Sequence, residues 1–129
     1  MRSKLNISKD YLLLINFAES LDMKINLFLG KLIDIRNTIQ TDKLTLLLEE
    51  ISNKINFYGS YALRLIKNFP EFSFILNRIN KSSEEIGILL KKWFKESSNR
   101  SIKISQIEGQ LKFIQLDSRE ILSKINDQN

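Results

Sequence analysis

Histidine and cysteine are both missing from this chain of 129 residues. Without cysteine the chain has no disulfide, no thiolate ligand for a metal and no thiol nucleophile. Without histidine it lacks the commonest general base and the commonest transition-metal ligand. We therefore expect a protein that is not an enzyme and that needs no metal or other cofactor.

Residues that form tight turns are scarce, with four Gly and one Pro in the sequence. A β-sandwich, a barrel or a doubly wound sheet needs many tight connections, which depend on these residues. No apolar run reaches the length of about 18 residues that a membrane-spanning helix requires. These absences predict a cytoplasmic protein with no membrane span, built from a few long helices.

What the sequence does contain is typical of one globular domain covering residues 1–129. Hydrophobic residues make up 43% of the chain and charged residues 27%, which is enough apolar material for a core. The formal net charge of +5 mildly favours acidic partners. Because the basic residues are spread along the chain, any basic site must be local.

Apolar residues recur at alternating spacings of three and four, which places them on one stripe of a helix. We call each such row a seam. The first three seams are Leu14, Ala18, Leu21, Ile25, Phe28, Leu32, Ile35 and Ile39; Leu44, Leu48, Ile51, Ile55, Tyr58, Ala62, Leu65 and Phe69; and Ile75, Ile79, Ser82, Ile86, Leu89 and Trp93. The fourth is Ile104, Ile107, Leu111, Ile114, Ser118, Ile121 and Ile125.

The seams predict helices over residues 8–40, 42–69, 70–97 and 101–127. Ser8 and either Thr41 or Asp42 are candidate N-caps, and Pro70 suits the first turn of the third helix. Short connections make consecutive helices antiparallel, so the predicted fold is all-α, an up-down-up-down four-helix bundle. The second choice is a three-helix arrangement in which the third segment breaks between Ser82 and Gly87; we favour one continuous helix.

Folding the seams against one another brings their small residues to one level of the bundle. Ala18, Ala62, Ser82 and Ser118 form this layer, which is either a close approach of helices or a small cavity. We favour close packing, because large neighbours can fill the space and cavities destabilise a core. No seam contains Asp or Glu, so we expect no core carboxylate whose pKa is raised by burial.

The first helix carries more apolar residues than one stripe requires. It is therefore either the central helix of the fold or covered by a partner helix or a second copy. The residues predicted to bind such a partner are Leu12, Leu13, Phe17, Leu27, Leu29 and Ile33.

A basic and aromatic cluster surrounds the loop at residues 97–101. Its members are Lys91, Lys92, Trp93, Lys95, Arg100 and Lys103. The lysines could contact phosphates while Trp93 stacks on a base, which makes nucleic-acid binding the alternative function. The preferred interpretation is that Trp93 closes the end of the core while the cations complement the helix C-terminal dipole.

These patterns predict a non-enzymatic protein-interaction module that binds another chain, or a second copy of itself, through helix faces. In size and plain helical build the chain resembles flagellar and type III export chaperones and the small helical subunits of CRISPR effector complexes. No residue motif connects it to either group, so the resemblance covers architecture only and carries over no functional residue. The predicted interaction module would act as an adaptor, an export-chaperone-like binder or an assembly subunit.

Overall fold

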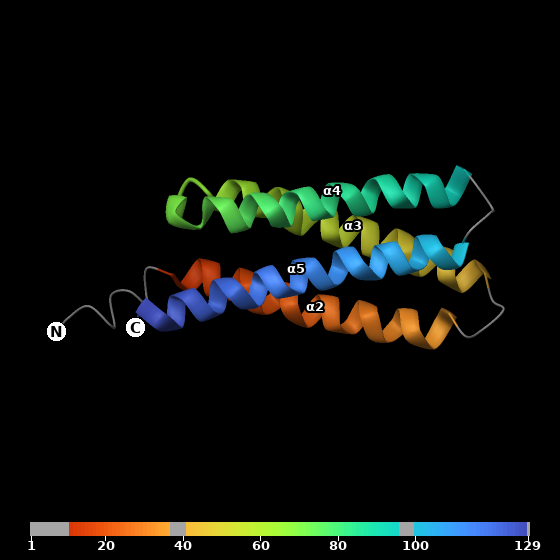
Figure 1. The fold of residues 1–129 in the computed structure, drawn as a ribbon, viewed down its shortest axis with the longest axis horizontal. Coiled ribbons are helices and arrows are strands. Elements are labelled where there is room, and N and C mark those ends of the chain that lie inside the picture. Colours follow the sequence, from red (N-terminus) through yellow and green to blue (C-terminus); the bar gives the residue numbers. More distant parts are fainter. Residues whose placement is uncertain (1–10, 37–40, 96–99, 129) are drawn as a thin grey trace.

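Four antiparallel α-helices form the described part of the chain (Figure 1). The computed structural model describes residues 11–36, 41–95 and 100–128. The helices are α2 (Leu12–Arg36), α3 (Thr41–Leu65), α4 (Ser73–Lys95) and α5 (Arg100–Gln128), with a short 3-10 helix, η1 (Pro70–Phe72), before α4. Each helix contacts the helices before and after it, and α2 also contacts α5. The predicted four-helix bundle is confirmed.

The core consists mainly of the four predicted seams. Their large apolar members are buried along all four helices, while Ile35 and Tyr58 are partly buried. Ile39 lies outside the described residues. Because α2 occupies one corner of the bundle and packs on α3 and α5, the alternative that it is the central helix is wrong.

The end of the second predicted helix needs correction. We expected it to continue to residue 69, but α3 ends at Leu65 and a turn follows, closed by the Phe69 N–H donating to the Leu65 carbonyl at 2.9 Å. Phe69 has φ −133° and ψ 63°, because a residue before proline is pushed out of the helical region. Pro70 then opens η1, and regular α-helix begins only at Ser73.

The other predicted boundaries agree closely with the structure where it is described. α3 begins at Thr41, with the Asp42 carboxylate in the first turn, where it complements the helix dipole. α4 is continuous through Ser82–Gly87, as favoured from the sequence. The predicted cap at Ser8 and the predicted helix ends at residues 8, 40 and 97 lie outside the described residues.

Helices α3 and α4 approach closely at the level of the layer of small residues, but one member of this layer was misassigned. Ala18, Ala62 and Ser118 are fully buried, whereas Ser83, and not Ser82, is the buried serine of α4. A Cβ added at Gly59 of α3 would lie 2.8 Å from Ser83 Cβ and still closer to its Oγ. The prediction of Ser82 is therefore wrong because the absence of a side chain at Gly59 lets α4 turn Ser83 inward.

Three hydrogen bonds satisfy polar groups in this layer. Asn80 Nδ2 donates to the Gly59 carbonyl at 3.0 Å, and Ser83 Oγ donates to the Asn80 carbonyl at 2.7 Å. Ser118 Oγ donates to the Ile114 carbonyl one turn earlier at 2.9 Å, as a buried serine in a helix commonly does. The polar atoms of the serines are thus used locally within the core.

Candidate protein-interaction surface

Aromatic side chains fill the interface between α2 and α3. The Phe17 ring is stacked on Tyr61 with 5.7 Å between centroids, and it lies 6.0 Å from Tyr58. Among the four neighbouring helix pairs, α2 and α3 make the sparsest contact. Bulky rings hold two helix axes farther apart than aliphatic side chains do, and a hollow opens on the outer side of this pair.

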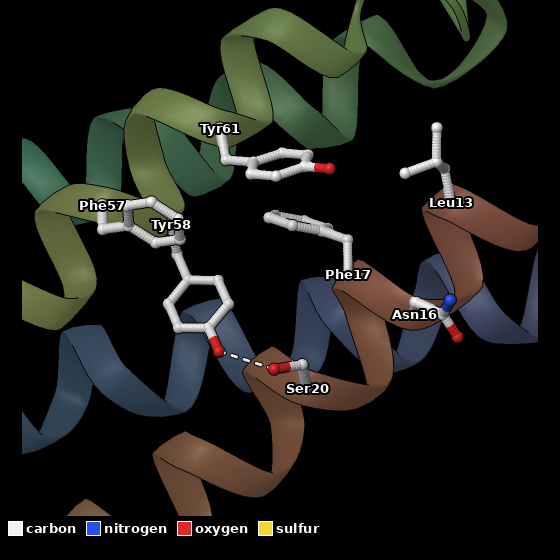
Figure 2. A pocket seen from close by; sticks show the side chains of 7 residues that line it. All are labelled: Leu13, Asn16, Phe17, Ser20, Phe57, Tyr58 and Tyr61. Carbon is white, nitrogen blue, oxygen red and sulfur yellow. Dashed lines mark hydrogen bonds between the residues drawn. The ribbon is translucent and has the colours of Figure 1, made fainter.

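The hollow between α2 and α3 has a volume of about 280 Å³ (Figure 2). It is lined by Leu13, Asn16, Phe17 and Ser20 of α2 and by Phe57, Tyr58 and Tyr61 of α3. A hydrogen bond of 2.6 Å between Ser20 Oγ and the Tyr58 hydroxyl joins the two helices at the hollow. None of these lining side chains is charged, so the surface favours an apolar occupant.

A second hollow of about 360 Å³ continues along α2. It shares Asn16 and Ser20 with the first and extends past Met23 to Leu27, with Glu19 and Lys24 at its edges. We call the continuous surface from Leu13 to Leu27 the α2 groove. At 1.5 Å per residue it runs for about 21 Å, or about four helical turns.

The flank of α2 that faces α5 is occupied by polar pairs instead. Arg119 Nε donates to Asp22 Oδ1 at 3.1 Å, and Gln115 Nε2 donates to Asn26 Oδ1 at 3.2 Å. These pairs fasten α2 to α5. The open side of α2 is therefore the side toward α3.

The six residues predicted to bind a partner do not share one surface. Leu13 and Leu27 line the α2 groove, whereas Leu12 and Ile33 are exposed but line neither hollow. Leu29 is half-buried, and Phe17 lines the first hollow although its side chain is only 5% exposed. The expectation that Phe17 lies free on the surface is wrong, because its ring fills the space between α2 and α3.

Sequence reasoning missed several residues of the groove. Asn16, Ser20 and Met23 continue the row that starts at Leu13, at spacings of three and four, and Met23 is 71% exposed. A second row of this spacing on the outward face of one helix was the signal available in the sequence. The contribution of Phe57 and Tyr61 depends on how α3 faces α2, which a single helix does not reveal.

A different hollow, of about 470 Å³, lies between α4 and α5. Within it Arg78 Nη2 lies 2.7 Å from Asp117 Oδ1 and 3.5 Å from Glu120 Oε1, and the guanidinium lies 5.0 Å from the centroid of the Phe74 ring. Burial raises the pKa of Asp117, and the negative charge of Glu120 adds to this, while the charge and hydrogen bond of Arg78 act in the opposite direction. Our expectation of no carboxylate with a pKa raised by burial is wrong, because Asp117 lies beside its seam rather than in it.

The basic and aromatic cluster is not assembled as a stacking surface in the described residues. Lys91, Lys92 and Lys95 are exposed, but Trp93 is 3% exposed and packs in the core. Lys103 is also buried, and its Nζ lies 3.5 Å from the Lys92 carbonyl in the last turn of α4, where a cation satisfies helix C-terminal carbonyls. The side chain of Arg100 lies outside the described residues.

Two features that the described residues lack bear on other classes of site. These residues contain no group of three or more acidic side chains placed to hold a metal ion. None of the described helices combines the length and apolarity that crossing a membrane requires. Comparison with known proteins gives no match: no family model, curated protein or solved structure is significantly similar to this chain.

Proposed function

We propose that this protein is a non-enzymatic interaction module that binds a helix of a partner chain in the α2 groove. The observation that carries the proposal is the groove itself, a continuous and largely uncharged surface on one open side of the bundle. Such a module serves as an adaptor, an export-chaperone-like binder or an assembly subunit.

The dimensions and chemistry of the groove suit a helix. A length of about four turns matches an amphipathic helix that presents apolar side chains at spacings of three and four. Leu13, Met23 and Leu27 are each half exposed or more, and burying such a side chain fully contributes about 1.5–3 kcal/mol. A few side chains of this kind, clustered in one groove, are typical of the residues that dominate an interface.

Nucleic-acid binding at the basic end receives less support from the structure. Base stacking there would depend on Phe94, which is exposed, rather than on Trp93, which is buried. The exposed cations of α4 near this end are Lys91, Lys92 and Lys95. These lysines suit the C-terminal turn of a helix without any ligand, so we do not propose this function.

Site-specific photocrosslinking tests the proposal. Benzoylphenylalanine is placed at Met23, in the groove, and in a separate variant at Asn77, an exposed position on α4. The Met23 variant is expressed in cells of the organism whose genome encodes the protein. There it is expected to give one discrete protein adduct, and this adduct is expected to disappear when the variant also carries the substitution Leu27→Glu. An equal adduct from Asn77, or no adduct from Met23, would contradict the proposal.

A further inference from the structure

We infer that the α2 groove is filled by α5 of a second copy of this chain, an inference that rests on the proposed function and names its partner. The reason is that α5 carries an exposed row of its own. Its members, at spacings of four and three, are Ile102, Gln106, Gly109, Phe113 and Leu116, and none of them is charged. We call this the α5 row.

The two faces of α5 indicate two helical neighbours. Its inward seam is already buried within the bundle, yet Ile102, Phe113 and Leu116 are 59%, 58% and 61% exposed. A helix with apolar rows of coiled-coil spacing on two faces is expected to pack on helices at both. Within this chain only the inward face of α5 is covered in the described residues.

The outward faces of α3 and α4 differ from those of α2 and α5. α3 and α4 also expose apolar side chains, but charged residues lie between them at the same spacings: Glu50 separates Leu46 from Phe57 on α3, and Lys81 and Glu84 separate Phe74 from Ile88 on α4. Charges in such a row oppose helix packing because they lose hydration without a partner. The α2 groove and the α5 row are therefore the surfaces of the described bundle best suited to each other.

Side-chain sizes in the two surfaces are complementary in an antiparallel arrangement. When Gly109 of one copy lies level with the Met23–Leu27 turn of the other, Ser20 falls level with the Phe113–Leu116 turn. An added Cβ at Gly109 would meet nothing within 4 Å, so this position offers open space to a large side chain. Between Ser20 and Leu27 of one copy, large residues of each helix thus face small residues of its partner, as close helix packing requires.

Charges beside the two surfaces are also complementary in this arrangement. Glu19, at the edge of the α2 groove, falls level with the stretch of α5 between Lys112 and Arg119. Lys112 is exposed, and Arg119 is exposed as well, although it already pairs with Asp22 of its own copy. Opposite charges at the rim of an apolar helix contact favour one register and one partner over others.

The contact joins two different surfaces, so it is heterologous. Each copy offers one groove, on the α2–α3 side of the bundle, and one row on α5, where Phe113 and Leu116 border the α4–α5 hollow. Heterologous contacts add copies head to tail and end only when a ring closes. The protein is then the repeating subunit of a homo-oligomer.

A complementation experiment tests this inference with Met23→Glu and Leu116→Glu. Both side chains are mostly exposed, so both variants are expected to fold, which far-UV circular dichroism checks. By light scattering after size exclusion, the unmodified chain is expected to be larger than one copy and each variant alone to be one copy. An equimolar mixture is expected to form a two-copy complex, because M23E keeps the α5 row and L116E keeps the groove.

The outcomes separate this inference from the proposed function. A monomeric unmodified chain, or a mixture of the two variants that fails to combine, overturns the pairing of α2 with α5. Loss of assembly in M23E alone, with L116E unaffected, overturns α5 as the occupant. A Met23 photoadduct with a different protein then preserves the proposed function, whereas the absence of any Met23 adduct removes both.

Asn77→Glu, on the outer face of α4, serves as the control and is expected to assemble normally.

Discussion

Gly59 allows the short distance between α3 and α4. Gly59 lies against Ser83, and its carbonyl accepts the Asn80 amide. Because glycine has no side chain, α3 and α4 can approach closely at this position. Gly87, by contrast, has open space around the position of an added Cβ.

Gly59→Ala is expected to lower the free energy of unfolding. Overpacking in a core typically costs about 1–3 kcal/mol, which exceeds the gain of about 1 kcal/mol from replacing glycine by alanine within a helix. Gly87→Ala, with nothing within 4 Å of its Cβ, is expected to raise stability by up to about 1 kcal/mol. Urea denaturation of both variants measures the difference. Equal changes in the two would contradict the close approach at Gly59.

Asp117 is expected to give the protein a stability that depends on pH. Burial raises its pKa above the ordinary value of 3.8, despite the opposing effect of Arg78. The folded state therefore binds a proton more tightly than the unfolded chain. The contribution of Asp117 to stability is then greatest in acid and falls as pH rises from the unfolded pKa through the raised folded pKa.

Asp117→Asn isolates this effect, because the amide cannot ionise. The unfolding free energy of the unmodified chain minus that of D117N is expected to decrease with rising pH and then level off. Urea denaturation at several pH values measures it. Glu84→Gln, at an exposed carboxylate in the middle of α4, controls for the loss of one negative charge. A difference that increases with pH would show that Arg78 outweighs burial.

At the scale of helices, the sequence predicts the fold well because the seams repeat one rule over every segment. Leu14 to Leu32 and Ile104 to Ile125 are buried where the spacing places them. The misplaced residues lie one position from a seam or between two helices: Ser83, Asp117 and Phe17. Their burial depends on the distance and rotation of the neighbouring helix, which the spacing within one helix does not contain.

The candidate site was harder to predict than the fold for the same reason. Leu13 and Leu27 were identified from the surplus of apolar residues on one helix, and they do line the α2 groove. Tyr58 and Tyr61 form the other side only because α3 presents them to Phe17. A surface made by two helices requires their relative orientation, and this comes from the structure.

Substitution of two adjacent aromatic residues at the end of α4 tests whether their side chains belong to the core or to a binding surface. Trp93 is 3% exposed and Phe94 is 53% exposed. Trp93→Ala is expected to reduce the unfolding free energy by about 3–5 kcal/mol, as for other large buried side chains. Phe94→Ala is expected to change it by less than about 0.5 kcal/mol. Denaturation followed by circular dichroism compares them, and similar small losses would place Trp93 outside the core.

For the whole molecule, the arrangement of apolar rows says more about the binding partner than the net charge does. A bundle that only had to fold would need one apolar face on each helix. Leu46 and Phe57 on α3 and Phe74 and Ile88 on α4 are also exposed, but charged residues lie between them in the outward rows. α2 and α5 carry additional rows on their open sides, which cost solubility unless another chain covers them. Because these two helices offer complementary rows, covering one with the other removes both exposed surfaces in a single type of contact.

Self-association of this kind links stability to protein concentration. Since assembly involves the folded state and not the unfolded chain, mass action shifts the folding equilibrium toward the native protein as concentration rises. The melting temperature of the unmodified chain is therefore expected to increase with concentration. The double variant M23E/L116E, which lacks both halves of the contact, is expected to melt at a temperature independent of concentration. Calorimetry over a range of concentrations measures this, and a constant melting temperature in the unmodified chain would show that the groove is not filled by a second copy.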